Sequence, residues 1–94
     1  MSKYKIQVTN RFKKEYKKIR TRNNFDEDAF VNVIKILANG ENLPEKYCNH
    51  LLEPKKNGIW ECHIKPDLLL IYMKNDNVLI LTLISTGSHS DLFK

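Results

Sequence analysis

The sequence predicts an α+β domain in which a two-helix hairpin packs on one face of an antiparallel four-stranded sheet, in the order β-α-α-β-β-β. Apolar residues between positions 11 and 37 recur at helical spacing. Apolar residues between positions 59 and 84 instead alternate or run together, as they do in strands. Ninety-four residues leave room for one domain, covering residues 1–94.

The first strand and the first helix are predicted from local signals. Residues 4–8 alternate between apolar and polar side chains, which is typical of a short strand. Thr9 or Asn10 can cap the helix that follows, because a side-chain oxygen there accepts a free backbone N–H. The apolar positions of this helix form a narrow stripe made of Phe12, Tyr16 and Ile19.

The second helix begins after a break at residues 21–24. Acidic residues at positions 26–28 favour a helix N-terminus, because they complement its dipole. Asn39-Gly40 is typical of a helix C-terminus, since glycine tolerates the left-handed conformation. The predicted buried face consists of Phe30, Val33, Ile34 and Leu37.

The second half of the chain reads as strands and turns after a long connection over residues 41–56. Trp60, Cys62 and Ile64 alternate with polar residues, whereas residues 68–71 are all apolar and therefore belong to a central strand. The predicted strands cover residues 59–64, 67–73 and 78–84, the predicted turns cover residues 55–58 and 75–77, and the tail covers residues 85–94.

Positive charge is concentrated in the first helix and the residues after it. The net charge is +5, and segment 11–22 exceeds this value alone, with Glu15 as its one acidic residue. Such a face is typical of a nucleic-acid binder, although a solvated helix face explains the same pattern. The residues predicted to bind RNA are Arg11, Lys13, Lys14, Lys17, Lys18, Arg20, Arg22 and Lys65.

Composition argues against several classes of protein. No apolar run reaches the roughly 18 residues of a membrane span, and no apolar signal segment is present, so we expect a cytoplasmic protein. Two cysteines do not make a disulfide framework. Cys48, His50, Cys62 and His63 are all zinc-ligand types, but adjacent residues of a strand point to opposite faces, so no metal site is predicted. No cofactor motif is present.

Three histidines are the candidate catalytic residues. His63 and Asp67 flank the predicted hairpin loop and are expected to lie opposite each other, so that Asp67 orients His63. His50 and His89 lie in the connection and the tail, and we expect the fold to bring all three imidazoles together. Histidine suits acid and base roles in RNA cleavage because its unperturbed pKa lies near neutrality. Taken alone, each histidine is more often a surface or hydrogen-bonded structural residue than a catalytic one.

Three stretches carry a family likeness: Asn49-His50-Leu51, residues 60–72 and residues 86–93. Together they resemble the YafQ branch of the RelE-like toxins of bacterial toxin–antitoxin pairs. The resemblance implies a ribosome-dependent mRNA endonuclease that cuts A-site codons without a metal, by attack of the 2′-OH on the adjacent phosphate. It also implies a cognate antitoxin of the DinJ or RelB type, the 70S ribosome and mRNA as partners, and operator DNA only through the toxin–antitoxin complex.

The same resemblance places His50, His63, Asp67, His89 and Phe93 in the active site. It suggests that His50 and His89 share the acid and base roles and that His63, held by Asp67, contacts the phosphate. Phe93 would stack on a nucleobase. Ordinary alternatives are a turn residue for Asp67 and a core plug for Phe93.

One position departs from the family pattern. The family usually carries an arginine four residues before the tail histidine, where this chain has Ser85. By analogy with an oxyanion-hole donor, losing its phosphate contact costs about 2.7–4 kcal/mol of transition-state stabilisation. Lys65 would replace it only as a point charge. The sequence thus leaves open an attenuated toxin that acts as an antitoxin- or ribosome-binding module, and a general RNA-binding domain.

Overall fold

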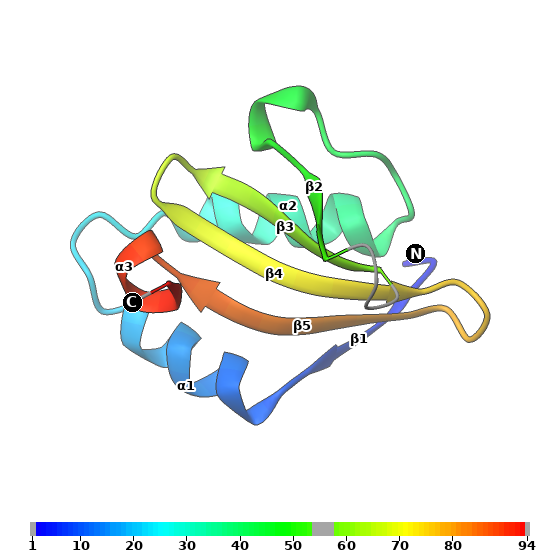
Figure 1. The fold of residues 1–94 in the computed structure, drawn as a ribbon, viewed down its shortest axis with the longest axis horizontal. Coiled ribbons are helices and arrows are strands. Elements are labelled where there is room, and N and C mark those ends of the chain that lie inside the picture. The colour runs from blue at the N-terminus through cyan, green and yellow to red at the C-terminus, as the bar shows by residue number, and fades with distance from the viewer. Residues whose placement is uncertain (1, 54–57, 94) are drawn as a thin grey trace.

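The computed structural model describes residues 2–53 and 58–93, which form an α+β fold around a five-stranded mixed sheet (Figure 1). Helix α2 lies behind the sheet, and the short helix α3 lies in front of it at the end of β5. In chain order the elements are β1 (Lys5–Val8), α1 (Asn10–Ile19), α2 (Glu27–Ala38), the 3₁₀ turn η1 (Glu45–Tyr47), β2 (His50–Glu53), β3 (Ile59–Lys65), β4 (Leu68–Asn75), β5 (Ile80–Gly87) and α3 (His89–Leu92).

The sheet differs from the prediction in two respects. Its strand order is β1-β5-β4-β3-β2, and β1 pairs with β5 in parallel rather than antiparallel orientation. One strand, β2, was not predicted: it lies within the predicted connection and pairs antiparallel with β3. Its residues Leu51 and Leu52 are consecutive, apolar and both exposed, so this edge strand carries no alternating pattern from which it could have been predicted.

Both predicted helices are present with capped N-termini. Thr9 Oγ1 accepts the backbone N–H of Phe12 at 3.0 Å, and Asp26 Oδ1 accepts that of Ala29 at 3.0 Å. After α2 the backbone turns at Gly40, whose φ is +78°, as the sequence predicts.

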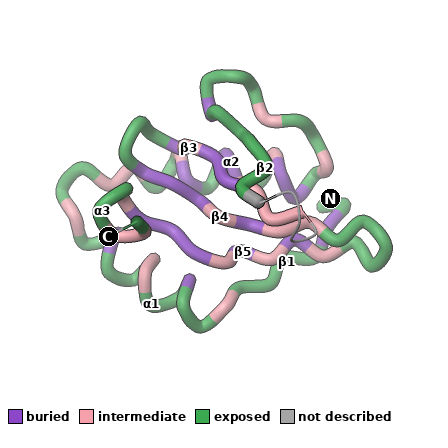
Figure 2. Tube along the Cα trace, in the orientation of Figure 1, coloured by how far each residue is buried: buried purple, intermediate pink, exposed green. Residues whose placement is uncertain are grey.

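The core lies between the two long helices and one face of the sheet. β4 is the central strand, as predicted, and Figure 2 shows burial concentrated along it and its neighbours. The ring of Phe30 lies 6.2 Å from that of Phe12 and 5.1 Å from that of Tyr16, so aromatic contacts join α1 to α2. The principal sheet residues of this core are Cys62, Ile64, Leu70, Tyr72, Leu81 and Leu83.

Strand ends differ from the prediction at several places. β5 begins at Ile80 rather than position 78, because Val78 is 60% exposed and Leu79 turns with a φ of +54°; it then continues to Gly87. Of the predicted turn at residues 55–58, positions 55–57 lie outside the described residues. No helix in the described ranges is long and apolar enough to cross a membrane.

Candidate active site

The structure brings the three histidines into one row that ends at an aromatic ring. His50 opens β2, His63 lies near the end of β3, and His89 opens α3. The ring centroids of His50 and His63 are 6.3 Å apart, and those of His63 and His89 are 5.6 Å apart. The ring of Phe93 follows at 6.3 Å from His89 and is 53% exposed, so it is not a core plug.

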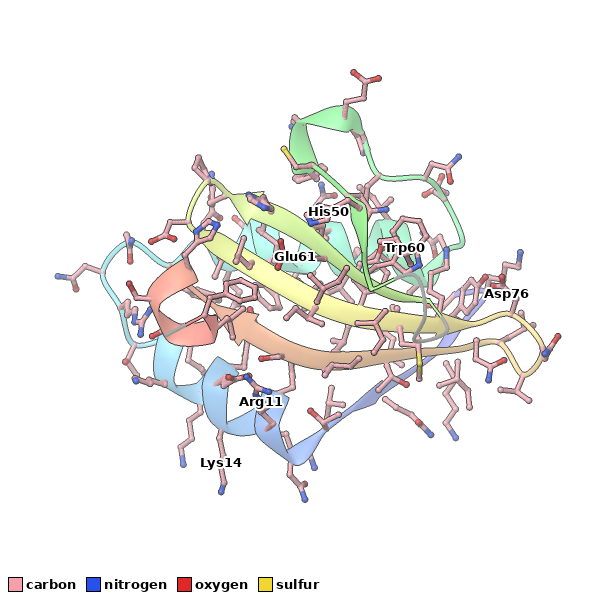
Figure 3. All side chains as sticks on the ribbon, in the orientation of Figure 1. Arg11, Lys14, His50, Trp60, Glu61 and Asp76 are labelled. Atoms are coloured by element: carbon pink, nitrogen blue, oxygen red, sulfur yellow. The ribbon has the colours of Figure 1, made fainter. Side chains whose placement is uncertain are left out.

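A buried carboxylate, Glu61, lies between the first two imidazoles, and sequence reasoning missed it. Its Oε1 is 3.3 Å from Nε2 of His50 and 3.6 Å from Nε2 of His63. The residue is 5% exposed, and its Oε2 has no hydrogen-bond partner among the described residues. Figure 3 shows His50 and Glu61 on neighbouring strands. The available signal was the i, i+2 spacing from His63, which places both side chains on one face.

His50 has a hydrogen-bond acceptor at each ring nitrogen. Nδ1 lies 2.8 Å from the backbone carbonyl of Cys48, and Nε2 faces Glu61. Cys48 has a φ of +48°, and this turn brings its carbonyl back towards the ring. A carbonyl and a carboxylate only accept, so both contacts are satisfied together when His50 carries two protons.

Asp67 anchors His89, and the predicted pairing of Asp67 with His63 is wrong. Asp67 Oδ1 lies 2.8 Å from Nδ1 of His89 and accepts its backbone N–H at 3.0 Å. These two hydrogen bonds hold the pKa of Asp67 below its usual value. The β3–β4 register pairs His63 with Leu69 and shifts before Lys65, so Asp67 is not opposite His63.

A second carboxylate fixes α3 from its other side. Asp91 accepts hydrogen bonds from Arg22 at 2.9 and 3.2 Å and from the backbone N–H of Ser88 at 2.8 Å. The guanidinium of Arg22, followed by the Ser88 N–H, holds the pKa of Asp91 well below its usual range. Arg22, predicted to bind RNA, is therefore engaged within the protein.

The other predicted RNA-binding residues fall into two groups. Arg11 pairs with Glu15 at 3.3 Å, and Lys65 pairs with Asp26 at 3.2 Å. Figure 3 shows Lys14 projecting away from the sheet, on the other side of the molecule from His50. The group that is exposed and makes no ion pair with a described residue consists of Lys13, Lys14, Lys17, Lys18 and Arg20.

A hollow of about 530 Å³ opens beside His63. Lys46 and Lys65 line it together with Tyr47 and Cys48. Its position next to the imidazole row and its two lysines make it suitable for a negatively charged chain such as an RNA backbone.

Ser85 is buried near the C-terminal end of β5. It is 1% exposed, and its Oγ donates to Glu15 Oε1 at 2.5 Å; the backbone N–H of Thr86 donates to the same oxygen at 3.2 Å. β1 pairs with β5 only as far as Leu83, so the Glu15 carboxylate satisfies the backbone where β1 ends. Ser85, which stands at the family's arginine position, is thus hydrogen-bonded to Glu15 of α1.

The four residues considered as zinc ligands, namely Cys48, His50, Cys62 and His63, do not form a site together. Cys62 is completely buried, which raises the pKa of its thiol to about 12, whereas Cys48 is exposed. Among the described residues, no group of three or more His, Cys, Asp or Glu side chains is placed to hold a metal ion.

Comparison with known proteins gives concordant matches. The family model described as the bacterial toxin of type II toxin–antitoxin system, YafQ, matches residues 4–94. The mRNA interferase toxin YafQ of Escherichia coli is 30% identical over 89 residues, 94% of each chain. The E. coli DinJ–YafQ complex contains a chain with a TM-score of 0.87 and 29% identity, covering 97% of this chain and 99% of that one. A metal-bound toxin from Helicobacter pylori has a TM-score of 0.84 and 38% identity, over 96% and 99% of the two chains.

Proposed function

This chain belongs to the YafQ family of bacterial type II toxins, and we propose that it is an mRNA endonuclease that cuts A-site codons on the ribosome and so inhibits translation. We propose that residues 1–94 form one toxin domain. The observation that carries it is the row of three imidazoles, anchored by carboxylates at both ends and flanked by an exposed aromatic ring.

His89 is proposed as the general base. Asp67 accepts from Nδ1, which fixes the proton on that nitrogen and leaves the lone pair of Nε2 for a substrate hydroxyl. Nε2 would take the proton of the 2′-OH while the 2′ oxygen attacks the adjacent phosphorus.

His50 is proposed as the general acid. Its Nδ1 lies 2.8 Å from the Cys48 carbonyl and its Nε2 faces the Glu61 carboxylate, so acceptors hold both ring nitrogens. The Nε2 proton has only a 3.3 Å contact and would pass to the departing 5′ oxygen as the P–O5′ bond breaks. The products are a 2′,3′-cyclic phosphate and a 5′-OH. The proposed proton transfers use imidazoles and do not involve a metal ion.

His63 lies between the proposed base and acid. An in-line displacement places the phosphate between its attacking and leaving oxygens, so the central imidazole is suited to contact the phosphate. Lys65, which lines the neighbouring hollow, would add positive charge if the phosphate displaces Asp26, its partner at 3.2 Å. Phe93 would stack on a nucleobase, because its ring is exposed next to His89.

The remaining partners follow from the relatives. Because the E. coli relative forms a complex with DinJ, we propose a cognate antitoxin of that kind for this chain. The exposed lysines of α1 are proposed to contact ribosomal or messenger RNA. Contact with operator DNA is proposed only for the toxin–antitoxin complex, and a cytoplasmic location fits all of these partners.

Codon-resolved cleavage on programmed 70S ribosomes tests the proposal. Purified protein should cut an mRNA bound in the A site and leave a 2′,3′-cyclic phosphate on the upstream fragment. Naked mRNA and ribosomes with a filled A site are the controls. Folded protein that leaves A-site mRNA intact would refute the nuclease.

A second function, an attenuated toxin acting as an antitoxin- or ribosome-binding module, is supported by Ser85. Its hydroxyl is buried against Glu15 and offers no charge to a phosphate. This alternative predicts ribosome binding in a sedimentation assay with cleavage near background. Measurable wild-type cleavage at the rate of an arginine-containing relative would exclude it.

A further inference from the structure

The helix that carries His89 has little support of its own. α3 is a single turn, His89–Leu92, and none of its residues is fully buried. A helix this short is not stable in isolation. Its position must therefore be set by contacts with the rest of the fold.

Asp91 provides one of those contacts and joins α3 to the segment that follows α1. Its two carboxylate oxygens accept one hydrogen bond each from the two terminal nitrogens of Arg22, which lies in the segment after α1. Oδ2 also accepts the Ser88 backbone N–H, and Ser88 Oγ accepts the backbone N–H of Asp91, forming a capping box. The other anchor is Asp67, which holds the ring and backbone of His89.

The chain before α3 is shaped for the approach of Asp91. A Cβ added at Gly87 would lie 2.8 Å from Cβ of Asp91, and Gly87 has a φ of +153°. Only glycine leaves this space for the carboxylate. The backbone at Gly87 therefore leaves the room in which the Asp91 side chain lies.

We propose that the Arg22–Asp91 ion pair is a positioning device for the active site, in which Arg22 acts through α3 to place His89 and Phe93. The inference rests on the proposed nuclease activity and assigns Arg22 a role other than RNA binding. A bidentate guanidinium–carboxylate pair suits this task because its two parallel hydrogen bonds fix orientation as well as distance.

The alternative is that Arg22 contacts RNA directly, and the two roles predict opposite effects of Asp91→Asn. If Arg22 binds RNA, removing the competing carboxylate frees its guanidinium and lowers KM. If Arg22 positions α3, Asp91→Asn displaces His89 and lowers kcat, because small misplacements of a reacting group cost about 10²-fold.

The experiment compares steady-state cleavage on programmed ribosomes, over a range of ribosome concentrations, for wild type, Arg22→Gln, Asp91→Asn and the double variant. Each single variant should lower kcat by about 10²-fold with little change in KM. The double variant should be no worse than either one, because both remove the same contact. Arg22→Lys, which keeps the charge but not the fork, should be intermediate. Arg20→Gln is the matched control: it removes a nearby exposed charge and should raise KM alone.

Hydrogen exchange of the His89 amide provides a readout that does not need activity. Arg22→Gln and Asp91→Asn should both speed this exchange while the amides of β4 keep their protection. Unchanged exchange, a kcat loss that merely follows the fraction unfolded, or a lower KM in Asp91→Asn would overturn the proposal. If the wild type does not cleave, the nuclease fails, but the exchange result still decides whether Arg22 holds α3.

Discussion

The two halves of the candidate site are held in place by different means. His50 and His63 lie on β2 and β3, so backbone ladders fix their separation and Glu61 joins them from a neighbouring position. His89 lies on one turn of helix that depends on two carboxylate contacts. The strand half should therefore tolerate surface changes, whereas the helix half should respond to single side-chain substitutions.

The carboxylates of the two halves also differ in environment. The side chain of Glu61 is 7% exposed, and that of Asp67 is 69% exposed. Charge interactions are stronger where water is excluded and are screened by salt where it is not. The Glu61 contacts should therefore persist at ionic strengths that weaken the Asp67–His89 pair.

The largest expected effect is the loss of the proposed base. His89→Gln should lower single-turnover cleavage on programmed ribosomes by about 10²–10⁴-fold, the usual contribution of a general base. The free energy of unfolding should change little, because the side chain is 55% exposed. Asn42→Gln, an exposed substitution outside the histidine row, serves as the control. Cleavage within about threefold of wild type would show that His89 is not the general base.

Glu61→Gln tests the strand half. We expect cleavage to fall by about 10²-fold, because the amide no longer offers the carboxylate oxygen that contacts and orients both imidazoles. The melting temperature should be unchanged or higher, because the variant removes a charge whose Oε2 is buried without a described partner. A melting temperature lowered together with activity would mean that Glu61 is needed mainly for folding.

Local sequence signals predicted most of the fold. The cap at Thr9, the acidic start of α2 and the apolar run of β4 depend on residues close together in the chain. The family likeness also pointed to residues that meet in the site. The strand β2 was missed because an exposed edge strand has no core face to impose a pattern.

The supports of the site could not be predicted, because they depend on register. A shift between His63 and Lys65 in the β3–β4 pairing sends Asp67 to His89 instead of His63. Asp91 and Arg22 are 69 residues apart, and nothing local to either residue indicates the partner. In the sequence, Glu61 is one of the polar residues that alternate with buried ones, which indicates an exposed position. In the fold, β2 pairs beside it and two histidines contact it, so that it is buried.

The helix half should also be distinguished by its acid stability. Arg22 and the Ser88 N–H lower the pKa of Asp91 in the folded state, whereas in the unfolded chain Asp91 titrates near 3.9. The contribution of this carboxylate is therefore fully present above about pH 5 and is lost as pH falls towards the folded pKa. Urea titrations from pH 5 to pH 2 should show a shallower loss of unfolding free energy in Asp91→Asn than in wild type. Equal slopes would contradict the contact.

The smallest effect is expected where the family arginine is restored. Ser85→Arg places a guanidinium within reach of Glu15, which already accepts from the Ser85 hydroxyl and the Thr86 N–H. The carboxylate should hold the new charge away from the phosphate, so cleavage should change by less than about tenfold even though such a contact is worth 10²–10³ when it is made. Ser85→Arg combined with Glu15→Gln should cleave faster than Ser85→Arg alone, and Glu15→Gln alone controls for the lost backbone contact. A gain of about 10²-fold or more from Ser85→Arg alone would show that Glu15 does not restrain the arginine and that Ser85 itself limits the rate.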